Sequence, residues 1–507
     1  MKKLSIYSLL GAFLLCSCAC GGKVDPVEPS IPQTPETPET PEVMTEGASV
    51  WTTTFDKSHV FEKTTVKFGK AATMSPYSVR FTDDKYQTVD GFGLAITQAS
   101  CYNLLKMSAS DRTKLLKELF SPTEGAGSSL IRVCIGGSDF SMDEYTWCDR
   151  EGIQNFAVHS SEEQYLFPIL DEIYRINPDV QIIGSPWSCP RWMKMTDEED
   201  NAKPKRGRGS WTGGRLDPKY YADYAEYFVK WIQEMQKRGY KILGVTLQNE
   251  PLNRGNSMSL YMPWEDQRDF LKVVGPAFEK AGLKTQIMLF DHNYNYDNQG
   301  SQKSYPLNIY ADAKAAKYAA GSAWHNYGGS VSELDRIHAG APEKGIWFTE
   351  ASIGTWNYGK GFGAQFQEDF RDIILGTLSR YGKGVTLWNL MLDDEGKPYR
   401  PHGCSTCYGA VSISHDTYAY NSVDRKSHWY DVVHASVAVK PGAVRIGTTG
   451  FTKGQLTYLV FRNPDTSYGV LILNEGSESQ QLVFADSAHS VTVNVPAKSV
   501  VSAAWKD

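Results

Sequence analysis

Two glutamates, Glu250 and Glu350, each end a short apolar run that is typical of a buried β-strand. The first run, 241–249, reads Lys-Ile-Leu-Gly-Val-Thr-Leu-Gln-Asn, and the second, 345–349, reads Gly-Ile-Trp-Phe-Thr. A buried strand that stops abruptly at a carboxylate is expected to deliver that acid to the rim of an active site. Two such acids can cleave a glycosidic bond, one as general acid/base and the other as nucleophile.

The elements that must position these acids alternate between strand-like and helical patterns from about residue 90 to 440. Helical periodicity separates most of the strand-like runs. It is clearest at 217–237, where Asp217 can cap the helix, Pro218 fits its first turn and apolar residues recur every three or four positions. Eight alternations predict an α/β fold of the (β/α)8 barrel type with insertions. The expected strands are 92–97, 130–136, 181–187, 242–249, 286–292, 322–327, 346–350 and 385–392, and the expected helices include 108–120, 162–176, 217–237, 264–281 and 364–381.

Polar and aromatic residues gather where these predicted strands end. In a barrel of this type the chemistry lies at the carboxyl ends of the strands. A purely structural protein would have no reason to collect such residues there. They are Asp139, Trp187, Asn249, Glu250, Asp291, His325, Tyr327, Glu350, Trp388 and Asn389.

The two flanks of the predicted barrel have a different pattern. Residues 49–89 and 443–507 consist of short alternating segments rich in Val, Thr and Tyr, separated by turn-forming residues. Neither flank alone holds many strands, so we expect one antiparallel β-sandwich built from both ends of the chain. The predicted division is 48–88 and 442–507 for the sandwich and 89–441 for the catalytic barrel.

The first 18 residues are typical of a bacterial lipoprotein signal. Lys2 and Lys3 precede an apolar run at 4–15, which is shorter than the roughly 20 residues that a membrane span needs. The run ends in Leu-Cys-Ser-Cys, which resembles a lipobox with Cys18 as the lipidated residue; Cys16 and Cys20 are alternatives. A plain secretory signal with incidental cysteines is the other interpretation. Either one predicts an exported protein.

A proline-rich linker, 19–47, follows the signal. Its prolines recur every third residue from 26 to 41, and this period lines one edge of a stiff polyproline II rod. A lipid anchor followed by such a spacer would hold a catalytic domain away from the membrane. We therefore expect an outer-membrane lipoprotein that faces the cell surface or the periplasm and contacts the membrane through its anchor alone.

Charge and cysteine content restrict the partners. A net charge of −6 without a long basic run argues against nucleic acid as a partner. Cys404 and Cys407 form one isolated C-x-x-C, whereas structural zinc normally needs a second pair of ligands. A local disulfide or two free thiols is the better interpretation, and export permits a disulfide. We expect no metal and no cofactor.

Seven blocks along the chain resemble glycoside hydrolase family 30, the retaining β-glycosidases that include glucosylceramidase and β-1,6-glucanases. They appear in the family's order and cover about residues 88–440. The flanks fit the barrel-plus-sandwich architecture of that family. The blocks are 90–93 (DGFG), 132–141 (RVCIGGSDFS), 185–194 (SPWSCPRWMK), 247–251 (LQNEP), 323–327 (AWHNY), 349–352 (TEAS) and 387–390 (LWNL).

This resemblance implies that Glu250 is the acid/base and Glu350 the nucleophile. Glu250 must begin the reaction protonated, so we expect its pKa to lie above that of Glu350, raised by burial and by the charge of Glu350. Asn249 is expected to bind the sugar 2-hydroxyl. Arg132, inside a strand, needs a carboxylate partner, and Glu350 is the expected one, although a structural ion pair elsewhere is an alternative.

The remaining predicted site residues surround these two acids. We expect His325 and Tyr327 to border the nucleophile. Asp139, Trp187 and Trp388 are expected to bind the sugar that is cleaved, and Asn389 is a further expected substrate contact.

Several substrates are compatible with the resemblance. The 138–141 (SDFS) and 388–390 (WNL) blocks favour the glucan and glucosylceramide branches, and a tethered lipoprotein suits polysaccharide capture. We therefore predict an endo-β-1,6-glucanase that acts by double displacement as a monomer. The alternatives are a glucosylceramidase-like exo-β-glucosidase, a β-xylanase or a β-1,6-galactanase, and, in a different class, a glycan-binding lipoprotein without catalysis.

Overall fold

The computed structural model describes residues 47–70, 75–256, 258–485 and 489–506. The predicted signal, Cys18 and all but the last residue of the predicted linker lie outside the described residues. Within these ranges, no helix combines the length and the apolar character needed to cross a bilayer.

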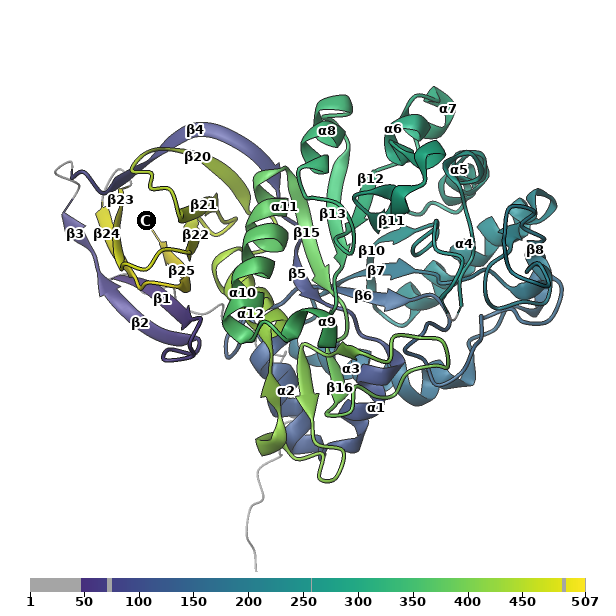
Figure 1. Ribbon diagram of the computed structural model, residues 1–507, viewed down its shortest axis with the longest axis horizontal. Helices are drawn as coiled ribbons and strands as arrows, with labels where there is room; N and C mark the ends of the chain where they lie inside the picture. The colour runs from purple at the N-terminus through teal and green to yellow at the C-terminus, as the bar shows by residue number, and fades with distance from the viewer. Residues whose placement is uncertain (1–46, 71–74, 257, 486–488, 507) are drawn as a thin grey trace, which may run out of the picture. The chain divides into compact units, whose positions relative to one another are not determined.

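Eight parallel strands form a closed barrel, as the sequence predicts (Figure 1). Seven neighbouring pairs form in the order β5-β15-β13-β12-β11-β10-β7-β6. Two backbone hydrogen bonds close the barrel between its end strands: Ser129 N to Phe92 O (3.2 Å) and Ile96 N to Arg132 O (2.9 Å). The barrel strands are β5 (Gly91–Leu94), β6 (Leu130–Cys134), β7 (Gln181–Ser185), β10 (Lys241–Thr246), β11 (Gln286–Asn293), β12 (Gly321–His325), β13 (Gly345–Glu350) and β15 (Gly382–Leu387).

Helices follow the strands and cover the outside of the barrel (Figure 1). Local sequence explains their starts: the Ser108 hydroxyl accepts from Asp111 N at the start of α2, and the Asp217 carboxylate accepts from Lys219 N in the turn before α4. The predicted helix 364–381 is α10 and α11, joined through a π-helical segment at Phe370–Leu375. The helices are α1 (Gln98–Lys106), α2 (Ala109–Phe120), α3 (Phe167–Ile176), α4 (Tyr221–Lys237), α5 (Trp264–Lys280), α6 (Tyr305–Tyr310), α7 (Ala313–Ala316), α8 (Glu333–Gly340), α9 (Thr355–Tyr358), α10 (Phe362–Asp369), α11 (Gly376–Ser379) and α12 (Ser427–Ala438).

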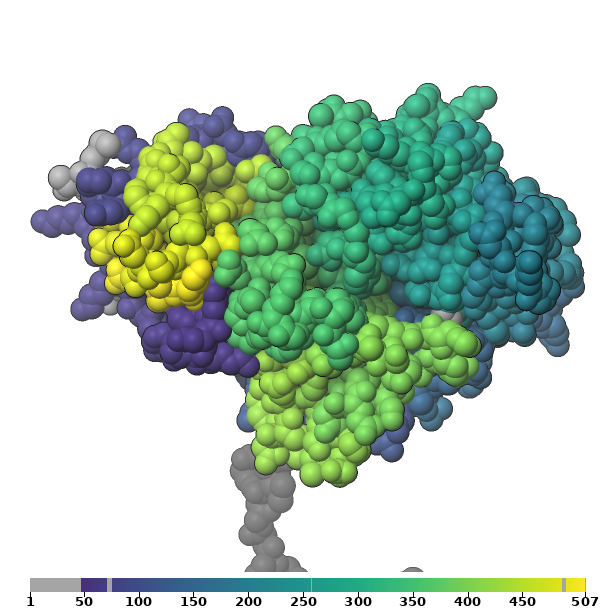
Figure 2. Space-filling model, in the orientation of Figure 1, coloured from purple at the N-terminus to yellow at the C-terminus, as the bar shows by residue number. Residues whose placement is uncertain are grey.

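A second, sheet-rich region contains strands from both ends of the chain, which confirms the predicted fold class. N-terminal β1 pairs antiparallel with C-terminal β25, and their purple and yellow surfaces adjoin in Figure 2. β4 likewise pairs with β20, although its pairing with β23 is parallel. Val50, Val470 and Trp505 belong to a core separate from that of the barrel. The strands are β1 (Gly47–Thr54), β2 (Glu62–Lys67), β3 (Gly69–Lys70), β4 (Ser78–Thr88), β20 (Val444–Gly450), β21 (Leu456–Arg462), β22 (Ser467–Asn474), β23 (Gln480–Ala485), β24 (His489–Val495) and β25 (Ser499–Lys506).

Short strands also form in the loops, as do a π-helical segment, Glu162–Leu166, before α3 and short 3-10 helices. A disulfide joins Cys404 to Cys407, which decides between the two interpretations of that C-x-x-C. The short strands are β8 (Lys194–Met195), β9 (Arg215–Leu216), β14 (Ile353–Gly354), β16 (Met391–Asp393), β17 (Cys407–Tyr408), β18 (Val411–Ile413) and β19 (Asp424–Arg425). Four further cysteines, Cys101, Cys134, Cys148 and Cys189, are free and buried.

Candidate active site

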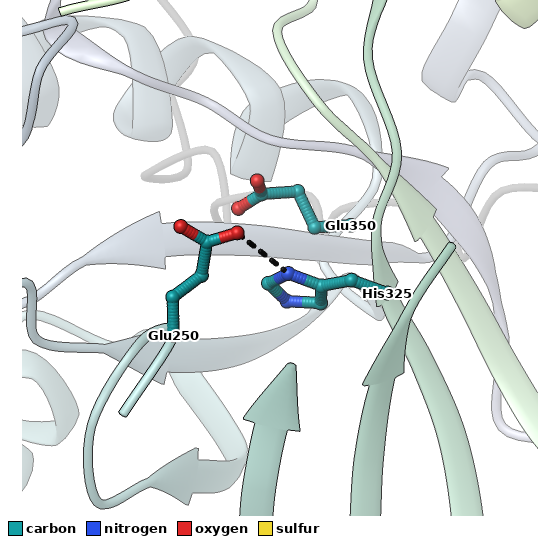
Figure 3. Close-up of side chains that lie close together, drawn as sticks. All are labelled: Glu250, His325 and Glu350. Atoms are coloured by element: carbon teal, nitrogen blue, oxygen red, sulfur yellow. Dashed lines mark ion pairs between the residues drawn. The ribbon is translucent and has the colours of Figure 1, made fainter. Parts of the chain in front are cut away.

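The carboxyl ends of the barrel strands bring Glu250 and Glu350 together (Figure 3). Glu350 is the last residue of β13, and Glu250 follows β10 in the turn after that strand. One oxygen of each carboxylate lies within 4.8 Å of the other, and both residues are buried. Retaining glycosidases hold their two carboxyl groups about 5–5.5 Å apart, whereas inverting enzymes need roughly 6.5–9.5 Å. The spacing is therefore that of a retaining pair.

The backbone at Glu250 is held in an unfavourable conformation. Its φ of 44° lies in the left-handed region, which costs a non-glycine residue about 1–3 kcal/mol and is found disproportionately at functional sites. Two backbone hydrogen bonds hold it there: Glu250 N donates to Asp291 O (3.0 Å), and Asn253 N donates to Glu250 O (2.9 Å). This turn directs the carboxylate toward Glu350 (Figure 3).

Glu350 is held by a cation on one oxygen and a phenol on the other. Arg132 Nη1 donates to Glu350 Oε2 (2.5 Å), and Tyr327 Oη donates to Glu350 Oε1 (3.0 Å). Arg132 is fully buried, and its Nη2 also donates to Asn249 Oδ1 (2.8 Å). Both the carboxylate partner expected for Arg132 and the expected proximity of Tyr327 to Glu350 are therefore present.

Asp291 is the centre of the polar network beneath the two glutamates. It is fully buried, and its Oδ2 accepts from Arg132 Nη2 (2.8 Å) and Thr246 Oγ1 (2.6 Å), while its Oδ1 contacts His325 Nε2 (3.0 Å) and accepts from Thr349 Oγ1 (2.6 Å). The charge of Arg132 and the contact with His325 outweigh burial and hold its pKa well below the usual range. The sequence places Asp291 at a strand end but indicates no role for it.

Glu250 is in contact with amides and an imidazole. Its Oε2 accepts from Asn253 Nδ2 (2.8 Å) and Asn256 Nδ2 (3.1 Å), and its Oε1 lies 3.6 Å from His325 Nδ1 (Figure 3). His325 is fully buried between Glu250 and Asp291, and its Nδ1 makes no hydrogen bond to a described residue. Each glutamate thus has its own set of donors.

The predicted order of the two glutamate pKa values is wrong for the free enzyme. Burial alone would lower the pKa of His325, but the nearby charges of Glu350, Asp291 and Glu250 outweigh burial and raise that pKa to about 9. Burial would raise the pKa of Glu250, but its contact with positively charged His325 holds that pKa below the ordinary value. Burial raises the pKa of Glu350, and the charges of His325 and Arg132 offset this only in part. The charge of His325 beside Glu250 reverses the expected order, because the contacts of Glu250, that with His325 foremost, together outweigh the effect of burial on its pKa.

The other predicted site residues are placed as follows. Asp139 is buried, and burial together with the charges of Glu350 and Glu250 raises its pKa to about 8. Trp187 and Trp388 stack on each other with ring centroids 5.1 Å apart, and both contact the Arg132 guanidinium. Asn389 is fully buried and its Oδ1 accepts from Thr97 Oγ1 (2.6 Å).

The residues that could hold a cation at this site are Glu250, His325 and Glu350, whose ligand atoms lie within 4.8 Å of one another. Arg132 already binds Glu350 as a full positive charge, and a protonated His325 would repel a metal ion. The charges present therefore fit sugar hydrolysis by the two carboxylates alone better than metal chemistry.

A large hollow elsewhere does not have this chemistry. A cavity of about 860 Å³ lies near the amino ends of the barrel strands and is lined by Gln181, Lys241 and Gln286, which begin β7, β10 and β11. Asp179 is the one acidic residue in its lining among the described residues. Without a second carboxylate it cannot perform the two-acid reaction.

Comparison with known proteins shows the family of the chain. The model of the glycosyl hydrolase family 30 TIM-barrel domain matches residues 89–436, and that of the family 30 β-sandwich domain matches 442–503. The endo-β1,6-glucanase BT3312 has a solved structure that superposes with a TM-score of 0.87 at 48% identity, covering 91% of this chain and 100% of that one.

The curated relatives include endo-1,6-β-D-glucanases and glucosylceramidases. An endo-1,6-β-D-glucanase of Trichoderma harzianum is 31% identical over 435 residues, which cover 82% of this chain and 84% of the relative. The lysosomal acid glucosylceramidase of Mus musculus is 27% identical over 420 residues, covering 80% and 78%. With the barrel, the sandwich and the paired carboxylates all in place, the chain is a glycoside hydrolase that belongs to glycosyl hydrolase family 30.

Proposed function

We propose that this protein is a retaining endo-β-1,6-glucanase with Glu350 as nucleophile and Glu250 as general acid/base. The observation that carries the assignment is the spacing of the two carboxylates, within 4.8 Å, in two different environments. Glu350 accepts hydrogen bonds from Arg132 and Tyr327, which hold it in place as an anion and favour its role as the nucleophile. Glu250 lies beside His325, which can be protonated, and this favours the role of general acid/base for Glu250.

Two displacements complete the reaction. Glu350 Oε attacks the anomeric carbon as the bond to the leaving oxygen breaks, and Glu250 gives its proton to that oxygen. The resulting ester links the sugar to Glu350. Glu250 then takes a proton from water, the water oxygen bonds to the anomeric carbon, and Glu350 departs as a carboxylate. Arg132 stabilises that carboxylate whenever it is free.

His325 supplies the proton that Glu250 needs at the start. In the free enzyme the pair holds its proton on His325, whose pKa is raised to about 9, 3.6 Å from Glu250 Oε1. A sugar that enters between the carboxylates excludes water and makes the charge on Glu250 more costly, so the proton moves to Glu250. The two residues therefore titrate as one unit.

The dependence of kcat/KM on pH should report this unit. Activity is expected to rise with pH as Glu350 ionises, through a pKa above its ordinary value, and to fall as the His325–Glu250 pair loses its proton near pH 9. In His325→Gln the falling limb reports Glu250 alone and should move to lower pH. His415→Gln, at an exposed histidine, is the control. An unmoved falling limb in His325→Gln would refute the shared proton.

The β-1,6-glucan assignment is supported by the names of the most informative relatives, an endo-1,6-β-D-glucanase of T. harzianum and the endo-β1,6-glucanase BT3312. Its test is a product profile. The enzyme is expected to release a ladder of short oligosaccharides from pustulan, a linear β-1,6-glucan, and none from xylan or β-1,6-galactan. Release of glucose alone, or activity only on glucosylceramide, would contradict endo action on this glucan. Binding without any product would favour the non-catalytic alternative.

We also propose that the enzyme is exported and tethered through lipid on Cys18, with an acidic, proline-rich spacer between the anchor and the barrel. The lipobox-like residues 15–18 and the three-residue proline period support this. Radiolabelled palmitate should enter the wild-type protein in a bacterial host and should be absent from Cys18→Ser. Cys16→Ser and Cys20→Ser are the matched controls and should keep the label. Label retained in Cys18→Ser would show that another residue is the anchor, and a wild-type protein without label would show that there is no lipid anchor.

A further inference from the structure

A second group of ionisable side chains lies outside the active site, between two helices. Asp369 is the last residue of α10, and His428 and Asp431 are on α12. One ligand atom from each of the three lies within 4.8 Å of the others. Asp369 is 5% exposed and the other two are 0% exposed. The reaction proposed above uses none of them.

Helix geometry explains why the three side chains meet. His428 and Asp431 are three residues apart, so they lie on the same face of α12. That helix packs against α10, with the rings of Phe366 and Tyr430 6.1 Å apart. The surroundings are thus apolar, and a charge placed there is poorly solvated.

Several polar atoms in this group have no hydrogen-bond partner. Among the described residues, neither ring nitrogen of His428 and neither carboxylate oxygen of Asp431 makes a hydrogen bond. Buried polar atoms are almost always satisfied, and a group that lacks a partner in the protein points to a bound ion or molecule. Asp431 is the strongest case because both of its oxygens are unpartnered at 0% exposure.

Asp369 has the supporting contacts that metal ligands usually have. Gln365 Nε2 donates to its Oδ1 (2.8 Å), and Ser427 Oγ donates to its Oδ2 (3.3 Å). Its Oδ2 lies 3.5 Å from His428 Nε2. Hydrogen bonds of this kind from neighbouring residues orient ligating carboxylates and are typical of built metal sites.

The group lacks a compensating positive charge. Among the described residues, no lysine or arginine forms an ion pair with Asp369 or Asp431. Burial raises the pKa of Asp369 to about 7, raises that of Asp431 as well, and lowers that of His428 to about 3. A dication would stabilise both carboxylates as anions and the imidazole in its neutral, ligating form.

We propose that Asp369, His428 and Asp431 form a buried structural site for one zinc ion. Imidazole nitrogen with carboxylate oxygens is a ligand set that suits Zn²⁺, whereas Ca²⁺ and Mg²⁺ prefer oxygen alone. Asp431, with both oxygens free of other hydrogen bonds, can ligate through both and so complete four-fold coordination. Because the ligands are buried, the ion enters as the protein folds.

The ion would hold the helix that connects the barrel to the sandwich. His434, further along α12, contacts Thr53 Oγ1 of β1 (2.8 Å) and Ser502 Oγ of β25 (3.0 Å). Tying α12 to α10 through the metal would therefore stabilise the attachment of both chain ends. The expected effect is on thermal stability.

Elemental analysis of the folded protein tests the site directly. The enzyme is produced in zinc-supplemented and zinc-depleted media and purified without a metal-chelate resin. Wild type from supplemented medium should contain one zinc per chain, and Asp431→Asn and His428→Gln less than about a tenth of that. Asp372→Asn, on the neighbouring turn, and Glu350→Gln, in the active site, should keep the full amount.

The melting temperature of wild type is the second readout and needs no variant. It should be higher by about 5 °C or more for protein from supplemented medium. Wild type without zinc and with the same melting temperature from both media would overturn the proposal, leaving a group of side chains that share a proton. Full zinc in a soluble Asp431→Asn, or loss of zinc in Glu350→Gln, would place the ion elsewhere and overturn it too.

Discussion

Glu350→Gln is expected to lower kcat on β-1,6-glucan by about 10⁴- to 10⁶-fold, because an amide oxygen cannot form the glycosyl ester that divides the reaction into two steps. The variant should still fold and bind substrate, since the amide oxygen can accept from Arg132 and the amide nitrogen can donate to the Tyr327 hydroxyl. Stopped-assay turnover and isothermal titration with an oligosaccharide measure the two quantities separately.

The matched control is Glu343→Gln, the same change at an exposed glutamate shortly before the same strand. Its kcat should equal that of wild type. A Glu350→Gln enzyme that keeps more than a hundredth of wild-type kcat, after exclusion of deamidation back to glutamate by mass spectrometry, contradicts the nucleophile assignment.

Arg132→Met should destabilise the fold and abolish activity together. Arg132 is the buried cation between Glu350 and Asp291, at 2.5 Å and 2.8 Å. Its removal leaves two buried carboxylates facing each other, which is expected to lower the free energy of unfolding by about 3–5 kcal/mol. Activity should fall because the pKa of Glu350 rises further and the nucleophile becomes protonated. Chemical denaturation and kcat measure the two effects.

A second substitution separates charge from packing in this prediction. Asp291→Asn removes one of the two buried charges that Arg132→Met leaves without their cation, so the double variant should be more stable than the sum of the single changes indicates. Strict additivity, or an Arg132→Met protein within about 1 kcal/mol of wild type, would show that the network does not have the electrostatic role given to it.

The barrel could be predicted from sequence because its strands are apolar runs separated by amphipathic helices. A parallel strand that is buried on both faces gives such a continuous apolar run. The two glutamates could be placed for the same reason: each interrupts such a run. The shared β-sandwich was also predictable, because neither flank alone has enough alternating segments to form one. The sequence does not show which strands pair, and the pairing of β1 with β25 is known only from the structure.

The role of Asp291 was not predictable in this way. Its backbone has a φ of 73°, and the register between β11 and β12 shifts between Phe290 and His292. Such an irregularity decides which way a side chain points, and it leaves no periodic signal in the sequence. The predicted order of the Glu250 and Glu350 pKa values is wrong for a related reason. The order depends on the direction in which one ring nitrogen of His325 points.

The group formed by Asp369, His428 and Asp431 depends on packing alone. Asp369 meets the other two only because α10 and α12 lie against each other. Two of its members form a short H-x-x-D pattern on one helix, which is too common to indicate a site without the third residue. Contacts between helices that are distant in sequence are the part of a site that a pattern cannot supply.

The proposed mechanism requires a covalent bond between Glu350 and the sugar. It is tested most directly by incubating the enzyme with an activated 2-deoxy-2-fluoro-β-gentiobioside, which slows hydrolysis of the intermediate, and mapping the label by peptide mass spectrometry. One label per chain is expected, on Glu350, with loss of activity in proportion. A label on Glu250 or any other residue, or turnover to product of inverted configuration without a label, would contradict it.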